Sequence, residues 1–216
     1  MNFSSLQTQA QTRHLTILGG FHPNDADQAP KGCKTLLLLG PDDPHFWPAF
    51  KNSPEWQDRA PDPMDRWSTR VIGDWAADID ASALYPFGGA PFLPFFTWAK
   101  RTGRTHASPI MLLVHDTAGL MVSFRGALAL QQHIDLPEPP LSPCATCTGQ
   151  PCRTACPVGA LDGTGYDVSS CTSFLDSQAG DDCMTAGCLA RRSCPVSQAY
   201  PRAAAQSAYH MKLFKG

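Results

Sequence analysis

Short apolar runs and amphipathic stretches alternate along the first 136 residues and predict both strands and helices. Residues 14–18 (HLTIL) and 35–39 (TLLLL) are apolar runs bounded by polar, Gly and Pro residues, which is typical of strands. The second run is continuous, so we expect a central strand buried on both faces. The polar residues 1–13 predict one short helix or a loose lead-in.

The clearest helical pattern lies at residues 62–79 (DPMDRWSTRVIGDWAADI). Asp62 is expected to cap the N-terminus, with Pro63 at the first helical position. Apolar side chains then recur every three or four residues, so they fall on one face that we expect to be core. These residues are Met64, Trp67, Val71, Trp75 and Ile79.

An aromatic segment at residues 83–99 (ALYPFGGAPFLPFFTWA) predicts a strand, a turn and a helix. Its glycine pair allows the backbone to approach a ligand closely, and the surrounding rings offer a flat surface to a cofactor such as cobalamin or FMN. A Gly-Pro turn with core aromatics explains the same pattern. The candidate cofactor-binding residues are Tyr85, Phe87, Gly88, Gly89 and Phe92.

Two further apolar runs, residues 110–115 and 120–127, flank the sequence Asp-Thr-Ala-Gly and predict a β-hairpin. Arg125 in the second run faces either an anionic group or solvent. The stiff, Pro-rich stretch 136–143 (LPEPPLSP) then separates two expected domains, 1–136 and 137–216.

Eight of the nine cysteines lie between residues 144 and 194, in two runs that each close with Cys-Pro. The first run has the spacing C-x2-C-x4-C-x3-C-P, which is close to the bacterial ferredoxin run C-x2-C-x2-C-x3-C-P. The second run is looser. Dense thiolates of this kind are the soft ligands that iron-sulfur clusters need, and eight of them predict two [4Fe-4S] clusters.

In two-cluster ferredoxins, the cysteine before the proline ligates the other cluster, and the same rule divides the ligands here. We expect the cysteine of the second Cys-Pro pair to complete the cluster site of the first run. The cysteine of the first Cys-Pro pair should likewise complete the site of the second run. The two sets are Cys144, Cys147, Cys152 and Cys194, and Cys156, Cys171, Cys183 and Cys188.

Zinc and disulfides are the alternative uses of these cysteines. Zinc ribbons pair two short knuckles, and neither run divides into such a pair. Disulfides suit an exported domain, but the N-terminal sequence MNFSSLQTQAQTRHL shows no apolar signal region. The ninth cysteine, Cys33, stands alone, and we expect it to be a small core residue.

Composition narrows the class of protein further. A chain of 216 residues with 43% apolar residues can build a real core, and 20 Pro with 17 Gly imply many loops. A formal charge of -2 without basic runs argues against a nucleic-acid partner. No apolar run approaches the roughly 18 residues needed to span a membrane. Thiols that must stay reduced indicate the cytoplasm.

The order of these features resembles the epoxyqueuosine reductase superfamily and its ferredoxin-like relatives. The matching segments are DPMDRW, YPFGGAPFLPF, RGAL and CATCTGQPCRTACPVGALDG. The resemblance implies an α+β fold, in which a nitroreductase-related, cobalamin-binding α/β domain precedes a bacterial-ferredoxin-like two-cluster module. YPFGGAPFLPF is also similar to part of the cobalamin-trafficking flavin reductases. Cys171 matches the single cysteine that this family has between its two runs.

Three functions are consistent with these observations. The first, which we favour, is ferredoxin-like electron transfer with a redox partner protein. The second is a corrinoid- or flavin-dependent reductase, in which the clusters feed electrons to a cofactor in the N-terminal domain. In the third, the clusters have only a structural role and stabilise a loop-rich C-terminal half.

Overall fold

The computed structural model describes all residues from 1 to 216 and divides them into two compact units. The chain contains both α-helices and β-strands, as the predicted fold class requires. The first unit comprises residues 1–104 and 123–140, and the second comprises residues 105–122 and 141–216. Residues 105–122 were expected in the first domain but belong to the cysteine-bearing unit. None of the helices combines the length and the apolar character needed to cross a membrane.

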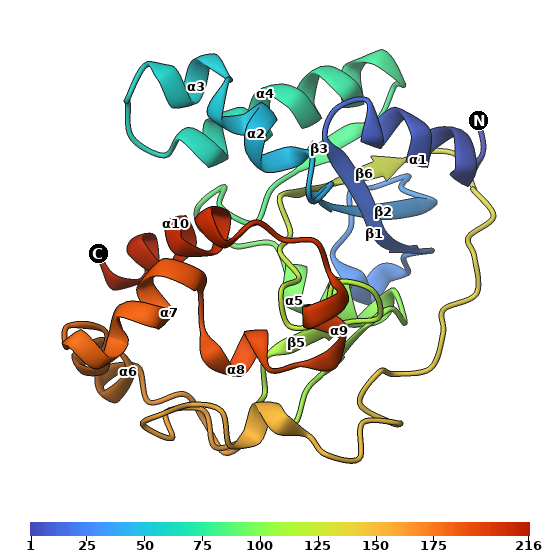
Figure 1. Cartoon of the computed structure of the whole chain (residues 1–216). Helices are drawn as coiled ribbons and strands as arrows, with labels where there is room; N and C mark the ends of the chain where they lie inside the picture. The colour runs from blue at the N-terminus through green and yellow to red at the C-terminus, as the bar shows by residue number, and fades with distance from the viewer. The chain divides into compact units, whose positions relative to one another are not determined.

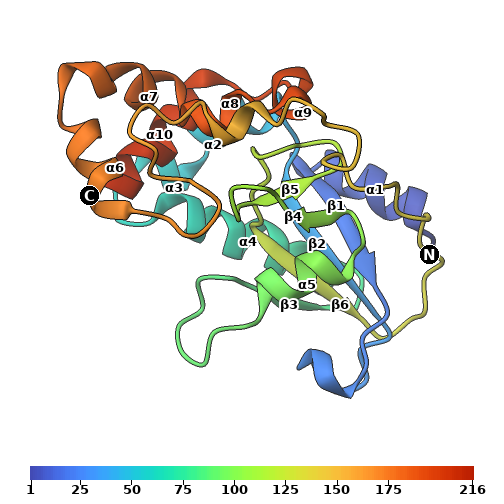
Figure 2. The same cartoon turned by 90° about the horizontal axis from the view of Figure 1, so that it is seen from below.

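A four-stranded antiparallel sheet forms the centre of the first unit. Its strands lie in the order β1 (Leu15–Phe21), β2 (Thr35–Pro41), β6 (Gly126–Leu130) and β3 (Ser82–Leu84). Every residue of β2 is buried, which confirms the central strand predicted from its continuous apolar run. Helices α1 (Phe3–Gln11) and α4 (Pro63–Asp78) cover one face, and α5 (Phe95–Arg101) lies on the other (Figures 1 and 2).

Helix α4 confirms the predicted amphipathic pattern with three differences. Met64, Trp67 and Trp75 are buried as expected, but Ile72 takes the core position expected for its neighbour Val71. Ile79, also expected in the core, follows the last residue of the helix and is only half-buried. Asp62 adopts a left-handed conformation at φ 52°, and its side chain accepts no capping hydrogen bond. Two shorter helices, α2 (Phe46–Lys51) and α3 (Pro54–Gln57), precede α4.

The predicted hairpin at residues 110–127 is wrong. Strand β5 (Leu113–His115) pairs with β4 (Thr105–Ala107) in the second unit, whereas β6 pairs with β2 and β3 in the first. Only an isolated bridge between His115 and Gly119 closes the turn. The second apolar run is therefore divided: Leu120 shares a core with Ile110 and Val114 of the first run, whereas residues 126–127 belong to the sheet of the first unit.

Arg125, directly before β6, is buried and bonded within the first unit. Its guanidinium forms an ion pair with Asp65 and donates to the Ser68 hydroxyl at 3.1 Å. The predicted anionic partner therefore exists, and it is a carboxylate of α4.

The second unit is rich in loops and short helices. Residues 141–167 contain one 3-10 turn, Pro151–Arg153, and a second such turn, Gln178–Gly180, lies farther on. Helix α10 (Ala204–Lys215) packs along α7 (Asp181–Ala186) (Figure 1). The helices are α6 (Val168–Leu175), α7 (Asp181–Ala186), α8 (Leu189–Arg192), α9 (Pro195–Ala199) and α10 (Ala204–Lys215).

Candidate metal centre

The eight clustered cysteines all lie in the second unit and are all free thiols. Those of the first run stand on loops and on the 3-10 turn, where the backbone folds back on itself. Those of the second run lie in α6 and α7 or directly before α8 and α9. Cys188 and Cys194 each occupy the residue before a helix, so their backbone is fixed where the helix begins.

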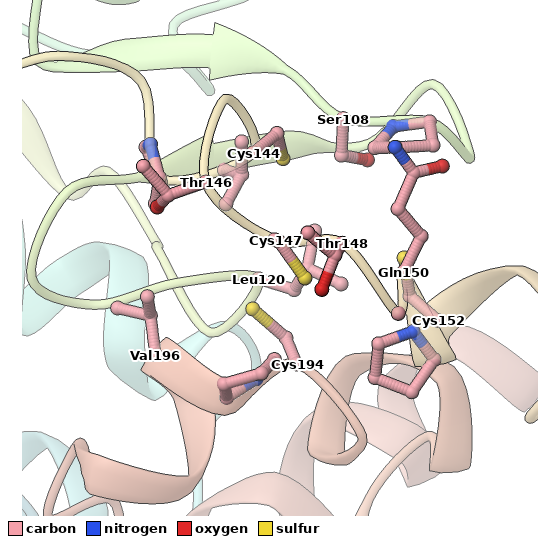
Figure 3. Close-up of a pocket in the computed structure, with 16 residues that line it drawn as sticks. Ser108, Leu120, Cys144, Thr146, Cys147, Thr148, Gln150, Cys152, Cys194 and Val196 are labelled. Carbon is pink, nitrogen blue, oxygen red and sulfur yellow. The ribbon is translucent and has the colours of Figure 1, made fainter.

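Four thiols line a single cavity of about 400 Å³ (Figure 3). The first three come from residues 144–152, and the fourth comes from the loop before α9, far along the chain. This is the set that the ferredoxin rule assigns to one cluster. The residues are Cys144, Cys147, Cys152 and Cys194.

Apolar side chains surround this cavity. Val114, Leu120 and Val196 contribute to its wall. Val114 and Leu120 belong to a buried core that also contains Cys152 and Cys194. The segment 105–122 therefore supplies the hydrophobic support of the thiols, which explains why it belongs to this unit. Such a shell limits solvent access and lowers the local dielectric, both of which tune a metal site.

One buried hydroxyl in the cavity wall lacks a partner. Ser108 is 7% exposed, and its Oγ makes no hydrogen bond. A buried hydroxyl without an acceptor costs about 1–3 kcal/mol. An occupant that carries acceptor atoms would satisfy it, so this wall suits a filled cavity.

The thiols of the cavity disfavour one another's ionisation. Burial raises the pKa of Cys144 and Cys152, and the charges of neighbouring thiolates raise it further. For Cys144, these neighbours are the other three members of its set. Four thiolates in one buried space need compensating positive charge, which bound metal provides.

The other four cysteines form a second neighbourhood. Burial raises the pKa of Cys171, a hydrogen bond from Tyr166 opposes this effect, and the charges of Cys188 and Cys156 raise the pKa again. Burial and the charge of Cys188 also raise the pKa of Cys183. These effects link Cys171 with Cys156 and Cys188, and Cys183 with Cys188. The second ligand set stays a prediction.

No three of the His, Cys, Asp and Glu side chains converge on a point where a single metal ion would bind. The thiols at the cavity surround a volume instead. A [4Fe-4S] cluster is held by four thiolates at its periphery, so its donor set and the cavity are compatible. Bound there, it would be held by Cys144, Cys147, Cys152 and Cys194.

The predicted cofactor segment is an exposed loop of the first unit. The Tyr85 ring lies 5.3 Å from that of Phe87, and its hydroxyl donates to the Thr69 carbonyl at 3.0 Å. The Arg125 guanidinium lies 5.3 Å from the Phe87 ring. Phe92 is 71% exposed. Gly88 and Gly89, which lie between Phe87 and Phe92 in the sequence, are also exposed. The structure thus brings Tyr85 and Phe87 together but leaves Phe92 in solvent.

Cys33 lies in the first unit, apart in sequence from the other cysteines. Its thiol donates to the Thr35 carbonyl at 3.4 Å, and burial raises its pKa. It is partly buried and has a local hydrogen bond, which is close to the core role expected of it.

Two residues near the thiols were not found from the sequence. Ser108 is separated from the cysteine runs by the whole Pro-rich stretch, so no spacing pattern connects them. Tyr166 lies five residues before Cys171, but nothing in that spacing indicates a contact. Its hydroxyl nevertheless donates to the Cys171 sulfur at 3.3 Å.

No protein-family model matches this chain, and no curated protein or solved structure is significantly similar to it.

Proposed function

We propose that this chain is an iron-sulfur protein that holds two [4Fe-4S] clusters and transfers electrons to and from a redox partner protein. One observation carries the proposal: Cys194 lines the same cavity as Cys144, Cys147 and Cys152. Cross-ligation between the two runs is the arrangement found in two-cluster ferredoxins. It holds the two sites close together in one unit.

A bound [4Fe-4S] cluster supplies one-electron redox chemistry. The chain's own residues bind and shield it: thiolates hold the irons, while Val114 and Leu120 keep water from one side of the cavity. An electron enters from a reduced redox protein and leaves to an oxidised one. The chain is therefore unchanged over a cycle, and no organic substrate is needed.

The relationship to the epoxyqueuosine reductase superfamily is part of this proposal. On that interpretation, the sheet unit corresponds to the nitroreductase-related domain and the cysteine-bearing unit to the ferredoxin-like module. Eight thiols that must stay reduced for cluster assembly favour the cytoplasm as the compartment.

The visible spectrum of anaerobically purified protein tests this function. We expect a broad iron-sulfur absorption that dithionite bleaches and that an oxidised acceptor protein restores. If the clusters resist reduction at all accessible potentials, their role is structural and electron transfer is not the function.

A second candidate is a reductase in which a corrinoid or flavin binds the first unit. The observation that favours it is the pair of partly buried rings, Tyr85 and Phe87, beside an exposed Gly88-Gly89 turn. Saturable binding of cobalamin or FMN, followed by calorimetry, would support this site. Gly88→Val should abolish this binding, because its side chain blocks the close approach of the backbone to the cofactor. The fold should tolerate it, since a Cβ at this position meets only the Tyr85 carbonyl oxygen, at 3.9 Å.

A further inference from the structure

Tyr166 makes a direct contact with one of the proposed cluster ligands. Its hydroxyl donates a hydrogen bond to the Cys171 sulfur at 3.3 Å. Tyr166 lies in the turn that leads into α6, and Cys171 lies within that helix. The contact is therefore local, and few backbone torsions separate donor from acceptor.

Two contacts position Tyr166, one through its backbone and one through its ring. Its backbone pairs with that of the buried Leu161 in an isolated β-bridge. Its ring stacks on Phe214 of α10, with ring centroids 5.8 Å apart and planes inclined by 14°. Because both supports act on the residue independently of the thiol, the hydroxyl is pre-positioned toward the sulfur.

We propose that Tyr166 is a positioning residue that raises the reduction potential of the cluster held by Cys156, Cys171, Cys183 and Cys188. This inference rests on the proposed function. Reduction adds negative charge to a cluster and its thiolates, and a hydrogen bond to a thiolate becomes stronger as that charge grows. Hydrogen bonds to the sulfurs are one of the factors that set such potentials. The reduced form therefore gains more from Tyr166 than the oxidised form does.

The test is Tyr166→Phe in the full chain loaded with iron and sulfide under anaerobic conditions. This variant keeps the ring and its stack on Phe214 and removes only the donor. A dithionite titration followed by electron spin resonance should show one potential shifted to more negative values. We expect a threefold to tenfold change in that reduction equilibrium, and tenfold corresponds to 59 mV for one electron. The other potential should not move.

Thr172→Val is the matched control. Thr172 is adjacent to Cys171, but its hydroxyl donates to the Val168 carbonyl at 3.0 Å in the same helix. Both potentials should remain at their wild-type values in this variant. The signal that Tyr166→Phe shifts should be the signal that Cys171→Ala abolishes.

Unchanged potentials in a fully loaded Tyr166→Phe protein would overturn the inference and leave the proposed function intact. A wild-type protein that binds no iron would overturn the proposed function instead, so the two failures are distinguishable. If Tyr166→Phe does not retain its second cluster, Phe214→Ala is the alternative test. This variant removes the stacking partner of the Tyr166 ring but keeps the Tyr166 hydroxyl, so it should weaken the hydrogen bond without abolishing it. A smaller negative shift of the same potential supports the role of Tyr166, and no shift rejects it.

Discussion

The backbone N–H of Leu120 donates to the Ser197 hydroxyl at 2.8 Å, and both groups are buried. Arg191 donates to the Leu120 carbonyl at 3.0 Å, so the N–H and the carbonyl of Leu120 are bonded to α9 and α8, the helices that directly follow Cys194 and Cys188. Gly119 is required here, since its φ is +56° and a Cβ would lie 2.5 Å from the Ser197 nitrogen. These contacts hold residues 119–120 against α9, directly after Cys194.

Ser197→Ala should therefore weaken the site that contains Cys194. The substitution leaves the buried Leu120 N–H without an acceptor, which costs about 1–3 kcal/mol. We expect a lower free energy of unfolding in urea and faster iron loss to a chelator. Ser173→Ala, on the exposed surface of α6, is the control and should match wild type in both measurements.

The pairing of ligands makes a separate prediction. Cys194→Ala and Cys147→Ala should each abolish the same electron spin resonance signal after partial reduction, because both thiols line one cavity. Cys171→Ala should abolish the other signal. If Cys194→Ala and Cys171→Ala remove the same signal, cross-ligation between the runs is wrong.

Much of this arrangement follows from sequence patterns that act over short distances. The apolar run of β2 and the helical face with Trp67 and Trp75 are local signals, and burial confirms both. The hairpin at residues 110–127 failed because a turn sequence does not specify strand partners. Strand Leu113–His115 pairs with strand Thr105–Ala107 instead. The Asp62 cap failed because a left-handed residue directs its side chain differently from an extended one.

The candidate site divides in the same way. The grouping of Cys194 with Cys152 at one cavity could be predicted, because the ferredoxin rule assigns the cysteine before each proline to the ligand set of the other run. The apolar wall formed by Val114 and Leu120 could not, since it depends on packing between distant segments. Ser108 is a similar case: its buried hydroxyl lacks a hydrogen-bond partner, and this depends on how distant segments fold together.

Removal of iron should loosen the second unit and spare the first. The core around Val114 and Leu120 includes Cys152 and Cys194, so loss of the metal removes the bonds that would join these thiols inside it. The strands β1, β2 and β6 form a separate core. Hydrogen exchange by mass spectrometry should show faster exchange after chelation in 105–122 and 141–216 only. Equal protection before and after chelation would contradict a folding role for the metal.

Ser108→Ala tests whether the cavity is filled. In loaded protein, the Ser108 hydroxyl should donate a hydrogen bond to the bound cluster. Its removal should make the reduction potential of the cluster that Cys147 holds more negative, with a change of up to about tenfold in the reduction equilibrium. The Cys171-dependent signal should stay in place. If neither potential moves and the loaded variant is more stable than wild type, the hydroxyl is unsatisfied in the occupied site as well.

The iron and acid-labile sulfide content of the chain tests the central claim most directly. Protein reconstituted without oxygen and freed of unbound metal should hold about eight iron and eight sulfide per chain, because two sets of four thiols each take one [4Fe-4S] cluster. Wild type and Cys33→Ala should give the same count, since Cys33 belongs to neither set. Saturation at four iron would contradict the two-cluster account, and zinc in place of iron under iron-replete, anaerobic conditions would contradict iron-sulfur chemistry altogether.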